Sequence, residues 1–554
     1  MTDFETIQRD RAERMAYWRE RGVYTDMSYA DAIREAMKVG ADQRLIFHSR
    51  ARPHETTAGA LNQEAERVAA AFHNLGLRRG DYIAVMLPTW AETTTAYLAA
   101  FKLGLAVVPI VAIYGPREIG FIVRQTQAKA LIIPDVFRGF DYLERVAAAG
   151  DLPSLKHLIV VGEKAPPGAT LWSDLPAAPG DAYPDPGKIA DEVCLVIYTS
   201  GTTSDPKGVR HTHNTMLCDI NAIVAEGGQP FVAPELGKPS LCMLPAGHIA
   251  GWLLMTRPFL TPSGDVVYVD QWIPEDAARL VEKHKVISTG GGGPVFLNTM
   301  TAAAKEHGID ISSLQMWALG GAPVAPENIR ASDSLGIAAW RSYGMSEHTV
   351  VTSGVPGEPF EKLANTDGRL TARNQMKICD DDGNELPIGE PGEICTLGPR
   401  LFVGYVDSEL DKACLMPGGW YKSGDIGTID DEGYLTVVDR KKDIIIRGGE
   451  NISAKEIEDV LSTMPGVVEP AAVAMPDPDL GERVCVYILA QPGAQITFDE
   501  MTAHFREQGV PRAKTPERLI LVEGDFPRTA SGKIKKHELR SALRAEAAEA
   551  ARQK

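Results

Sequence analysis

The pattern of apolar and polar residues along the first two hundred positions predicts strands that alternate with helices. Apolar residues recur at helical spacing over 60–75, and Gly76 follows where a helix would end. A second helix is predicted over 91–104. Short apolar, often β-branched runs predict strands at 83–87, 106–111, 130–133, 158–161 and 194–197. Because strands that alternate with helices build mostly parallel sheets covered by helices, the pattern predicts an α/β fold.

The pattern changes near residue 376. From about 376 to 438, short strands are separated by Gly, Asp and Pro turns, which predicts a small β-rich unit. A compact tail is expected after it, with a helix near 454–463, strands near 471–474 and 483–490, and a last helix from about 536. These changes place a domain boundary at 439–443.

Length and charge narrow the class of protein. The 554 residues exceed the roughly 250–300 at which single hydrophobic cores stop growing, so two or more domains are expected. The 57 Lys and Arg residues against 74 Asp and Glu residues give a formal charge of −17, which argues against broad nucleic-acid binding. Positive charge gathers instead near the C-terminus, at 440–442, Arg447 and 533–536.

Cysteine usage and hydropathy point to a reducing interior. The seven cysteines form no C-x-x-C pair, and their odd number fits neither a disulfide framework nor a zinc knuckle, so a cytoplasmic location is expected. Residues 1–22 have no apolar core, so no signal peptide is visible. The longest uncharged windows, around 239–256 and 286–304, contain Pro, Gly and His. They are interpreted as buried core and loop, without a membrane span.

A loop rich in hydroxyls and glycines follows the apolar run at 193–197. Its candidate phosphate ligands are Thr199, Ser200, Gly201, Thr202, Thr203 and Lys207. Backbone N–H groups and hydroxyls can surround phosphate oxygens, and the lysine adds a compact positive charge. The loop is not the common P-loop, because Pro206 stands where its second glycine belongs and Gly208 follows the lysine.

Four further strings suggest nucleotide chemistry. In 341–347, an aromatic ring can stack on a base, and Glu347 is a hard-oxygen candidate ligand for Mg²⁺. The string 420–425 ends in Asp425, whose carboxylate can accept both hydroxyls of a ribose. The strings 439–452 and 527–534 add basic residues, a glycine pair and Lys533. Any one of these strings alone could be an ordinary turn or a solvated charge cluster.

Together, and in this order, the strings resemble the motifs of the adenylate-forming (AMP-binding) superfamily, which includes acyl-CoA synthetases, luciferases and adenylation domains of peptide synthetases. Two departures are Ser204, where the family usually has glycine, and Ser346, which replaces threonine. The resemblance implies a large N-terminal domain, 1–439, with two α/β sheet subdomains and a small β-rich, barrel-like subdomain. A hinge at 440–442 and a small mobile α+β C-terminal domain, 443–554, would follow.

The resemblance also implies roles for single residues. Lys533, Glu347 and Lys207 would be catalytic, with Lys533 bridging the acyl carboxylate and the α-phosphate, and Glu347 and Thr203 would hold Mg²⁺. Lys442 would be the hinge residue. The rest of the implied ATP/AMP site comprises Gly321, Ala322, Pro323, Arg341, Ser342, Tyr343, Gly344, Met345, Ser346, Asp425 and Arg440. Gly448 and Gly449 would line a CoA tunnel, and the implied acyl pocket comprises His248, Trp252, Gly291, Gly292 and Gly320.

The implied reaction joins a carboxylic acid to AMP and then to a thiol. A carboxylate and ATP would give acyl-AMP and pyrophosphate, and CoA would then give acyl-CoA and AMP, with Mg²⁺ as the metal. The four glycines at 290–293 hint at room for a bulky acid, and the strings at 202–214 and 341–348 look most like ligases for cyclohexanecarboxylate and steroid-derived acids, with medium-chain fatty acids next.

Several alternatives stay open at this point. A stand-alone adenylation enzyme that loads a carrier protein would share every nucleotide motif. A luciferase-like oxygenase and a non-enzymatic ATP-binding scaffold are further readings, disfavoured because nothing indicates a luciferin and because Lys533, Glu347 and Asp425 are intact. The partners expected are small molecules, without nucleic acid, and a homodimer is left open.

Overall fold

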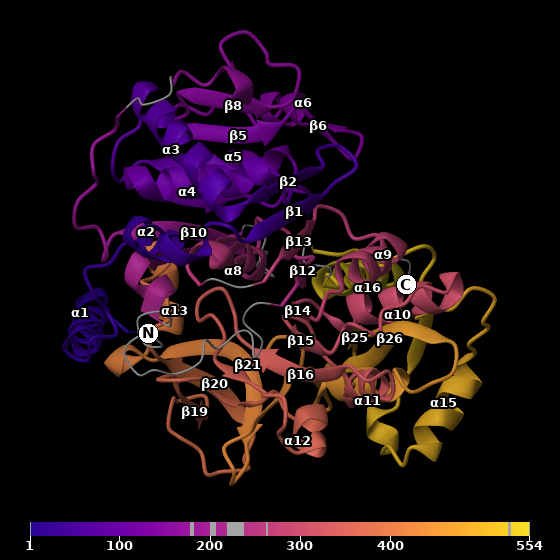
Figure 1. Ribbon diagram of the computed structural model, residues 1–554. Coiled ribbons are helices and arrows are strands. Elements are labelled where there is room, and N and C mark those ends of the chain that lie inside the picture. Colours follow the sequence, from indigo (N-terminus) through magenta and orange to yellow (C-terminus); the bar gives the residue numbers. More distant parts are fainter. Residues whose placement is uncertain are drawn as a thin grey trace.

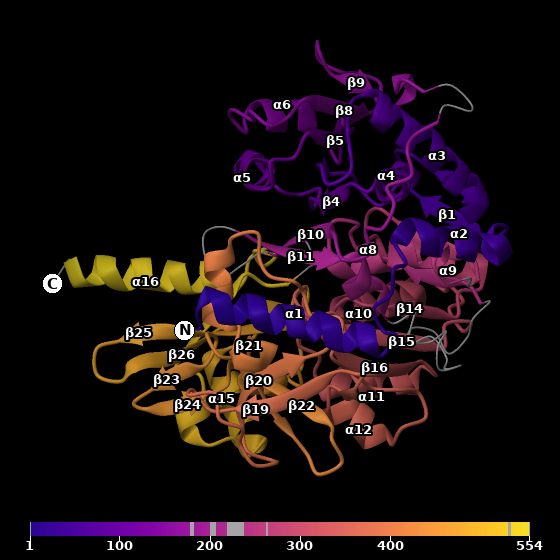
Figure 2. The same cartoon turned by 90° about the vertical axis from the view of Figure 1, so that its left-hand side faces the viewer.

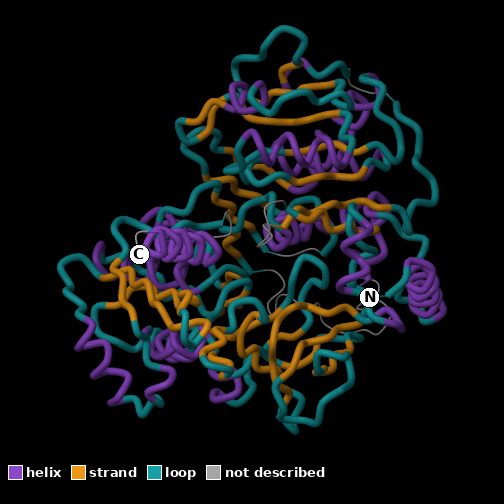
Figure 3. Tube along the Cα trace, turned by 180° about the vertical axis from the view of Figure 1, so that it is seen from behind, coloured by secondary structure: helices purple, strands orange, loops and turns teal. Residues whose placement is uncertain are grey.

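The computed structural model describes residues 2–177, 182–199, 206–218, 238–261, 264–529 and 533–552. Figure 1 shows an upper lobe of early strands and helices, a lower lobe that contains β-rich chain, and a C-terminal part beside it. Seen from behind, helices and strands interleave in the upper lobe, whereas strands gather in the lower middle of the molecule with helices on either side (Figure 3). The structure is therefore mixed α/β, with a large N-terminal and a small C-terminal part, as the sequence predicts.

The first sheet has seven strands in the order β11-β10-β4-β3-β5-β8-β9. Its strands are parallel except for the antiparallel pair of β10 and β11. The strands are β3 (Tyr82–Val85), β4 (Ala106–Pro109), β5 (Ala130–Pro134), β8 (His157–Val161), β9 (Thr170–Leu171), β10 (Val193–Thr199) and β11 (Lys207–Thr212). The accompanying helices are α3 (Ala58–Asn74), α4 (Ala91–Leu103), α5 (Pro116–Thr126) and α6 (Tyr142–Ala147), with a small hairpin of β6 (Val136–Phe137) and β7 (Phe140–Asp141).

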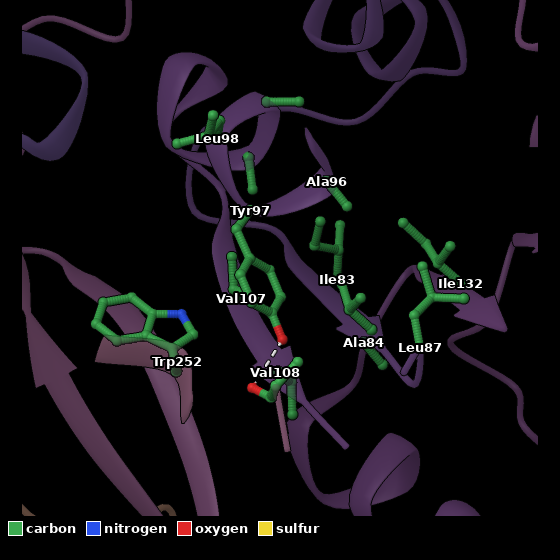
Figure 4. Packing of buried hydrophobic residues seen from close by; sticks show 14 of the residues in the cluster. Ile83, Ala84, Leu87, Ala96, Tyr97, Leu98, Val107, Val108, Ile132 and Trp252 are labelled. Atoms are coloured by element: carbon green, nitrogen blue, oxygen red, sulfur yellow. Dashed lines mark hydrogen bonds between the residues drawn. The ribbon is translucent and has the colours of Figure 1, made fainter. Parts of the chain in front are cut away.

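The predicted helices and strands of this region are confirmed within a few residues. Helix α3 follows the expected periodicity, and its N-terminus is capped by Thr57, whose hydroxyl accepts a hydrogen bond from the Ala60 N–H at 3.2 Å. Helix α4 is buried on nearly all sides, because it lies between the sheet and the rest of the N-terminal part. Figure 4 shows Tyr97 of α4 among Val107, Val108 and Trp252, with its hydroxyl donating to the Ala246 carbonyl at 3.1 Å.

The second sheet has nine strands in the order β18-β17-β16-β15-β14-β12-β13-β1-β2, with a parallel centre and antiparallel edges. The strands are β1 (Arg44–His48), β2 (His54–Thr57), β12 (Ser240–Cys242), β13 (Val266–Val269), β14 (Ser288–Gly290), β15 (Met316–Gly320), β16 (Ala338–Tyr343), β17 (Thr352–Ser353) and β18 (Arg369–Leu370). The helices are α2 (Tyr29–Gly40), α8 (Ile249–Thr256), α9 (Pro274–His284), α10 (Pro294–His307), α11 (Pro326–Ser334) and α12 (Phe360–Asn365).

The two uncharged windows contain more helix than the sequence suggested. The window at 239–256 contains α8, and the window at 286–304 contains most of α10, where only buried core and loop were expected. Proline at the first turn of α10 starts the helix instead of breaking it, because its missing N–H is not needed there. No helix among the described residues is long and apolar enough to cross a membrane.

The β-rich unit is a four-stranded antiparallel sheet in the order β19-β20-β21-β22. Its strands are β19 (Gln375–Cys379), β20 (Gly392–Leu397), β21 (Tyr421–Ile429) and β22 (Leu435–Arg440). The short helix α13 (Asp411–Cys414) and the N-terminal helix α1 (Phe4–Glu20) pack beside it, and α1 lies across this lobe in Figure 2.

The chain after Arg440 builds a separate sheet around its own apolar cluster. Its strands are β23 (Ile445–Arg447), β24 (Glu450–Ile452), β25 (Val467–Asp477), β26 (Gly481–Ala490) and β27 (Arg518–Leu521). Its helices are α14 (Ala454–Leu461), α15 (Phe498–Glu507) and α16 (Lys536–Arg552). Helix α16 projects from the body of the molecule in Figure 2.

Candidate active site

Lys207, Glu347 and Tyr405 form a compact polar cluster between the first sheet and the β-rich unit. The Lys207 Nζ lies 5.5 Å from the centroid of the Tyr405 ring, a distance typical of a cation–π contact. The Tyr405 hydroxyl donates to Glu347 Oε1 at 2.6 Å. Burial and the Glu347 charge raise the pKa of Tyr405, so its hydroxyl stays protonated and remains a donor. The cluster places one cation and one carboxylate around a single neutral phenol.

The absence of a side chain at Gly208 brings this cluster together. A Cβ at Gly208 would lie 2.8 Å from Tyr198 Cζ and 2.8 Å from Val406 Cγ2. The Val406 N–H donates to the Gly208 carbonyl at 2.8 Å, which ties β11 to the segment that contains Tyr405. Glycine after the lysine, which separates this loop from the common P-loop, is therefore a packing requirement here. Of the loop, Ser200, Gly201, Thr202 and Thr203 lie outside the described residues.

Tyr343, Asp425 and Arg440 form a second group. Asp425 and Arg440 are opposite each other across β21 and β22. The Tyr343 hydroxyl donates to Asp425 Oδ2 at 2.8 Å, and Arg440 Nε lies 3.5 Å from Asp425 Oδ1. Burial and the Asp425 charge raise the pKa of Tyr343, so this phenol also remains a donor. The Asp425 side chain is 14% exposed, so it is mostly buried while it is paired.

Lys533, in the C-terminal part of the chain, is subject to charges from both groups. Burial, together with the nearby charges of Arg440 and Lys442, lowers the pKa of Lys533 to about 8, although Asp425 and Glu347 oppose the shift. Burial and the Lys533 charge also lower the pKa of His248 to about 4, so the imidazole is neutral at pH 7. The lysine is therefore within electrostatic range of residues from both groups and of His248.

Thr529 and Lys533 are joined by two hydrogen bonds. The Thr529 N–H donates to the Lys533 carbonyl at 2.7 Å, and the Lys533 N–H donates to the Thr529 hydroxyl at 3.1 Å. The neighbouring Arg528 pairs with Glu469 and Asp525. A lysine with its backbone held in this way loses less conformational freedom when it meets a ligand.

The shifted pKa of Lys533 predicts a pH dependence. The charged form of the lysine attracts anions; it predominates below the pKa of about 8 and is lost progressively as pH rises through that value. We expect kcat/KM for acid activation to fall as pH rises through about 8. Lys442→Gln removes a neighbouring positive charge that lowers this pKa, so its falling limb should move to higher pH.

Initial-rate profiles of pyrophosphate exchange from pH 6 to 10 would measure this limb. In Lys533→Arg, the guanidinium stays charged over the whole range. Any residual activity of that variant should therefore show no falling limb near pH 8. An unchanged limb in Lys533→Arg would assign the titration to another group and contradict the prediction.

Some residues predicted for the site have side chains that point elsewhere. The Arg341 guanidinium is buried and donates to the Ala364 carbonyl, and the Ser342 hydroxyl lies 2.9 Å from the Ser353 hydroxyl. Gly344 lies where a Cβ would be 2.5 Å from the Val350 amide nitrogen. These residues contribute backbone and shape to the strand end that contains Tyr343.

Glycine and proline residues around β15 shape one wall near this group. A Cβ at Gly320 would lie 2.7 Å from the Ser342 carbonyl oxygen, so glycine lets β15 and β16 approach at their ends. Gly321 has a φ of +74°, and nothing lies within 4 Å of its missing side chain. Ala322 packs near Gly293, and Pro323 continues the turn.

The candidate acyl pocket is only partly assembled from the predicted residues. His248 caps α8, its Nδ1 accepting from the Ala250 N–H at 3.3 Å, and its charge environment links it to Lys533. Trp252 is fully buried in the hydrophobic core, with its ring centroid 5.6 Å from Tyr29 and 6.1 Å from Phe101. A residue inside the core cannot form an open wall, so we leave Trp252 out of the pocket proposed below.

Space at the glycine run is already occupied in part. A Cβ at Gly291 would lie 2.4 Å from Leu244 Cδ1, and a Cβ at Gly292 would lie 2.7 Å from Phe296 Cδ2. Both glycines have positive φ, +78° and +81°, which other residues rarely adopt. The run therefore admits Leu244 and Phe296 against the backbone, and these two side chains would set the pocket's width.

Gly448 and Gly449 form the two-residue turn between β23 and β24. Their φ values are +58° and +90°, the pattern of a tight hairpin turn in which glycine is strongly favoured. A Cβ at Gly448 would lie 3.3 Å from Leu480 Cδ2, whereas nothing lies within 4 Å of one at Gly449. Conformation thus explains both glycines, and the open side of Gly449 leaves room beside the turn.

Sequence reasoning missed the residues that hold 346–348 in place. The His211 Nε2 lies 2.7 Å from the Ser346 carbonyl, and burial lowers the His211 pKa to about 4, so the neutral ring donates. The His348 ring lies 2.9 Å from the Thr396 hydroxyl and 3.0 Å from Asn374 Oδ1. The closely spaced His211 and His213 were a visible signal, but Tyr405 had none, because only the fold brings it to Glu347.

The Glu347 carboxylate is a suitable ligand for a Mg²⁺ ion that substrate phosphates also bind. Mg²⁺ is usually held by one or two carboxylates together with substrate phosphates. Within the described ranges, no group of three or more His, Cys, Asp or Glu side chains could hold a metal. A single carboxylate such as Glu347, near Lys207, suits a metal ion that substrate phosphates also hold. It does not suit an ion that is held by protein side chains alone.

The chain belongs to the AMP-binding enzyme family, because the family model for the AMP-binding enzyme matches residues 33–406 and that for its C-terminal domain matches 456–533. It is thus an adenylate-forming carboxylate ligase that works through an acyl-AMP, of the class that contains the acyl-CoA ligases.

Relatives are similar over nearly their whole length. The medium-chain fatty-acid–CoA ligase of Escherichia coli (strain K12) is 33% identical, across 95% of this chain and 92% of its own. The salicyl-AMP ligase / salicyl-S-ArCP synthetase of Mycobacterium tuberculosis is 30% identical, across 95% and 93%. ATP-bound MatB from Rhodopseudomonas palustris superposes with a TM-score of 0.80 at 25% identity, across 93% of this chain and 99% of its own.

Proposed function

We propose that this enzyme is an ATP-dependent carboxylate–CoA ligase acting on a cyclic, alicyclic or medium-chain carboxylic acid. The observation that supports it most is the charge environment of Lys533. Its pKa responds to Arg440, Lys442, Asp425 and Glu347, and it in turn depresses the pKa of His248. A lysine near the residues proposed to contact the ribose, the phosphates and the acid suits the step in which a carboxylate attacks the α-phosphorus.

In the first half-reaction, a carboxylate oxygen of the acid would attack the α-phosphorus of ATP. The bond from that phosphorus to the bridging oxygen breaks, and pyrophosphate leaves with its electrons. Lys533 would neutralise the acid's carboxylate and the α-phosphate as charge moves, and Lys207 would bind the departing phosphates. Asp425 would accept the ribose hydroxyls, with Tyr343 and Arg440 holding its carboxylate. Mg²⁺ at Glu347 and Thr203 would lower the charge repulsion among the phosphates.

The site would also need to handle adenine and exclude water. Gly321, Ala322 and Pro323 would present backbone to the base, and the ring of Tyr343 would lie beside it. Neutral His248, Leu244 and Phe296 would line the acid's side of the site, together with Gly291, Gly292 and Gly320. Because the His248 imidazole is neutral, Lys533 would be the cation of this pair that attracts the acid's carboxylate.

In the second half-reaction, the thiolate sulfur of CoA would attack the acyl carbon, and the carbon–oxygen bond to AMP would break. AMP leaves, and the thiol proton passes to solvent. The pantetheine would pass beside Gly448 and Gly449, where the open side of Gly449 offers room. A rotation of the C-terminal part about Lys442 would exchange Lys533 for this turn.

Ion pairs on each side of Lys442 support a pivot there. Lys441 Nζ lies 2.7 Å from Asp381 Oδ1 and 3.1 Å from Glu393 Oε2, which ties it to the β-rich unit. On the other side, Asp443 Oδ1 lies 2.5 Å from Arg540 Nη1 of α16. Lys442 thus lies between two anchored neighbours, so rotation about its backbone would move one anchored group against the other.

Loading of a carrier protein is the second candidate function. The relative from Mycobacterium tuberculosis, a salicyl-AMP ligase / salicyl-S-ArCP synthetase, is 30% identical to this chain. Both candidates predict the same first half-reaction and differ only in the thiol that accepts the acyl group. Turnover with free CoA at micromolar to millimolar concentration favours the CoA ligase.

The acid is best identified with a panel of linear, aromatic and alicyclic acids, with AMP release measured with and without CoA. We expect alicyclic acids to exceed linear ones in kcat/KM, because the strings at 202–214 and 341–348 resemble those of ligases for cyclohexanecarboxylate and steroid-derived acids. A clear preference for acetate would contradict this proposal. AMP release that depends on an added carrier protein and ignores CoA would favour the second candidate.

We also propose a cytoplasmic location for the enzyme. The described residues include all seven cysteines, and these form no disulfide among themselves; six of the seven thiols are buried. Such thiols persist in reducing compartments.

A further inference from the structure

The N-terminal helix α1 lies outside the 33–406 region that the family model matches. It nevertheless contacts Phe402, whose backbone is hydrogen-bonded to Glu347. Arg14 on this helix is 9% exposed. Its Nη2 donates to the Phe402 carbonyl at 2.8 Å. Burying a guanidinium is costly unless it is hydrogen-bonded, so the hydrogen bond to Phe402 stabilises Arg14 in its buried position.

The next link runs from Phe402 to Glu347. The Phe402 N–H donates to the Glu347 carbonyl at 2.8 Å, and Leu401 bridges His348 in antiparallel fashion. The 399–406 segment therefore lies between helix α1 and the 346–348 turn. The Tyr24 hydroxyl adds a third support from the N-terminal region, because it donates to the Pro399 carbonyl at 2.6 Å.

A parallel set of contacts reaches the Glu347 side chain. Arg11 of α1 lies with Nη2 3.2 Å from Asp411 Oδ2, and the Asp411 carboxylate is 1% exposed. Asp411 Oδ1 accepts from the Tyr405 N–H at 2.8 Å, and the Tyr405 hydroxyl donates to Glu347. Gly404 makes this possible, since a Cβ there would lie 2.5 Å from Arg11 Nη2 and from Asp411 Oδ2.

We infer that helix α1 is a positioning element for Glu347 and Lys207, with Arg14 and Arg11 as its positioning residues. Arg14 fixes the Glu347 backbone through Phe402. Arg11 fixes the Glu347 carboxylate through Asp411 and Tyr405, the residue whose ring also lies beside Lys207. Neither arginine touches the reacting atoms, so both act on adenylation through the geometry of the phosphate side of the site. The inference rests on the proposed adenylation role of Glu347.

The test separates the two half-reactions in purified Arg14→Ala, Arg14→Lys and Arg11→Ala enzymes. Pyrophosphate exchange measures adenylation at varied Mg²⁺, and supplied acyl-AMP with thiol measures the second step. Because misplacement by about 1 Å can cost on the order of a hundredfold, we expect Arg14→Ala to slow adenylation about tenfold to a hundredfold. Its half-saturating Mg²⁺ should rise, and the thiol step should stay within about twofold. Arg14→Lys should recover part of the loss.

Arg9→Ala is the matched control, since Arg9 is on the same helix and 62% exposed. It should behave as the unmodified enzyme in both assays. If Arg14→Ala does not fold, Arg11→Ala and Arg14→Lys decide the question by the same split. Equal losses in both half-reactions, or full adenylation at unchanged Mg²⁺ demand in folded variants, would overturn the inference. Absence of exchange in the unmodified enzyme would instead refute the proposed function itself.

Discussion

Replacing Lys533 with alanine should reduce acyl-AMP formation by a factor on the order of 10²–10³ while the thiol step survives. A preorganised cation that acts where charge develops contributes about this much to rate. Pyrophosphate exchange reports the first step, and conversion of supplied acyl-AMP and CoA to thioester reports the second. The thiol step should stay near the unmodified rate, because Lys533 would be turned away from the site during it.

Lys535→Ala is the control for this experiment. Lys535 lies two residues away, and its Nζ is 2.9 Å from Glu538 Oε1 on the surface. It should leave both half-reactions within about twofold. Equal loss of the two half-reactions in Lys533→Ala would refute the rotation about Lys442. It would also refute the proposal that Lys533 acts in the first half-reaction and is turned away during the second.

Glu347→Gln should be the second most damaging change, with adenylation slowed about a hundredfold. The amide keeps the size of the side chain and an oxygen that can accept from Tyr405, so packing is preserved. What is lost is the negative charge, the property that suits a hard cation. The rate should recover in part at high Mg²⁺, which titration of pyrophosphate exchange against Mg²⁺ would measure.

Glu361→Gln provides a matched control on an exposed carboxylate that pairs with Arg330. Its adenylation rate and Mg²⁺ demand should be unchanged. If Glu347→Gln kept full adenylation at the usual Mg²⁺ concentration, Glu347 would not be the ligand, and the phosphate side of the site would need another carboxylate.

Much of the architecture follows from local patterns. The strands β3, β4, β5, β8 and β10 lie where apolar runs predict them, because a buried parallel strand needs a short continuous apolar stretch. The strands β25 and β26 are longer than predicted, with 11 and 10 residues. Their antiparallel ladder also includes polar residues and glycine, which an apolar pattern does not predict as strand. Helices in the two uncharged windows were missed, because Pro and Gly at helix starts look like breaks in the pattern.

The site divides in the same way. Lys533, Asp425 and Glu347 were predicted from their strings and stay predictions, and the charges that act on Lys533 belong to residues of those strings. Trp252 was assigned to the pocket by resemblance, but its ring is in the core. Periodicity does not show on which side of a short helix the space for a ligand lies. Whether the glycines at 291 and 292 leave space depends equally on Leu244 and Phe296, which come from elsewhere in the chain or fold back on it.

By itself, the sequence determined the family and the alternation of strands and helices in the first two hundred residues, and it supplied the candidate polar residues of the site, because motifs and apolar periods are properties of neighbouring positions. Only the tertiary structure decided which side chains support them. Arg14 and Phe402 are 388 positions apart, and Tyr405 reaches Glu347 across 58. Such partners carry no local signal, since a hydrogen bond between distant segments depends on how the whole chain packs and not on the spacing of any motif.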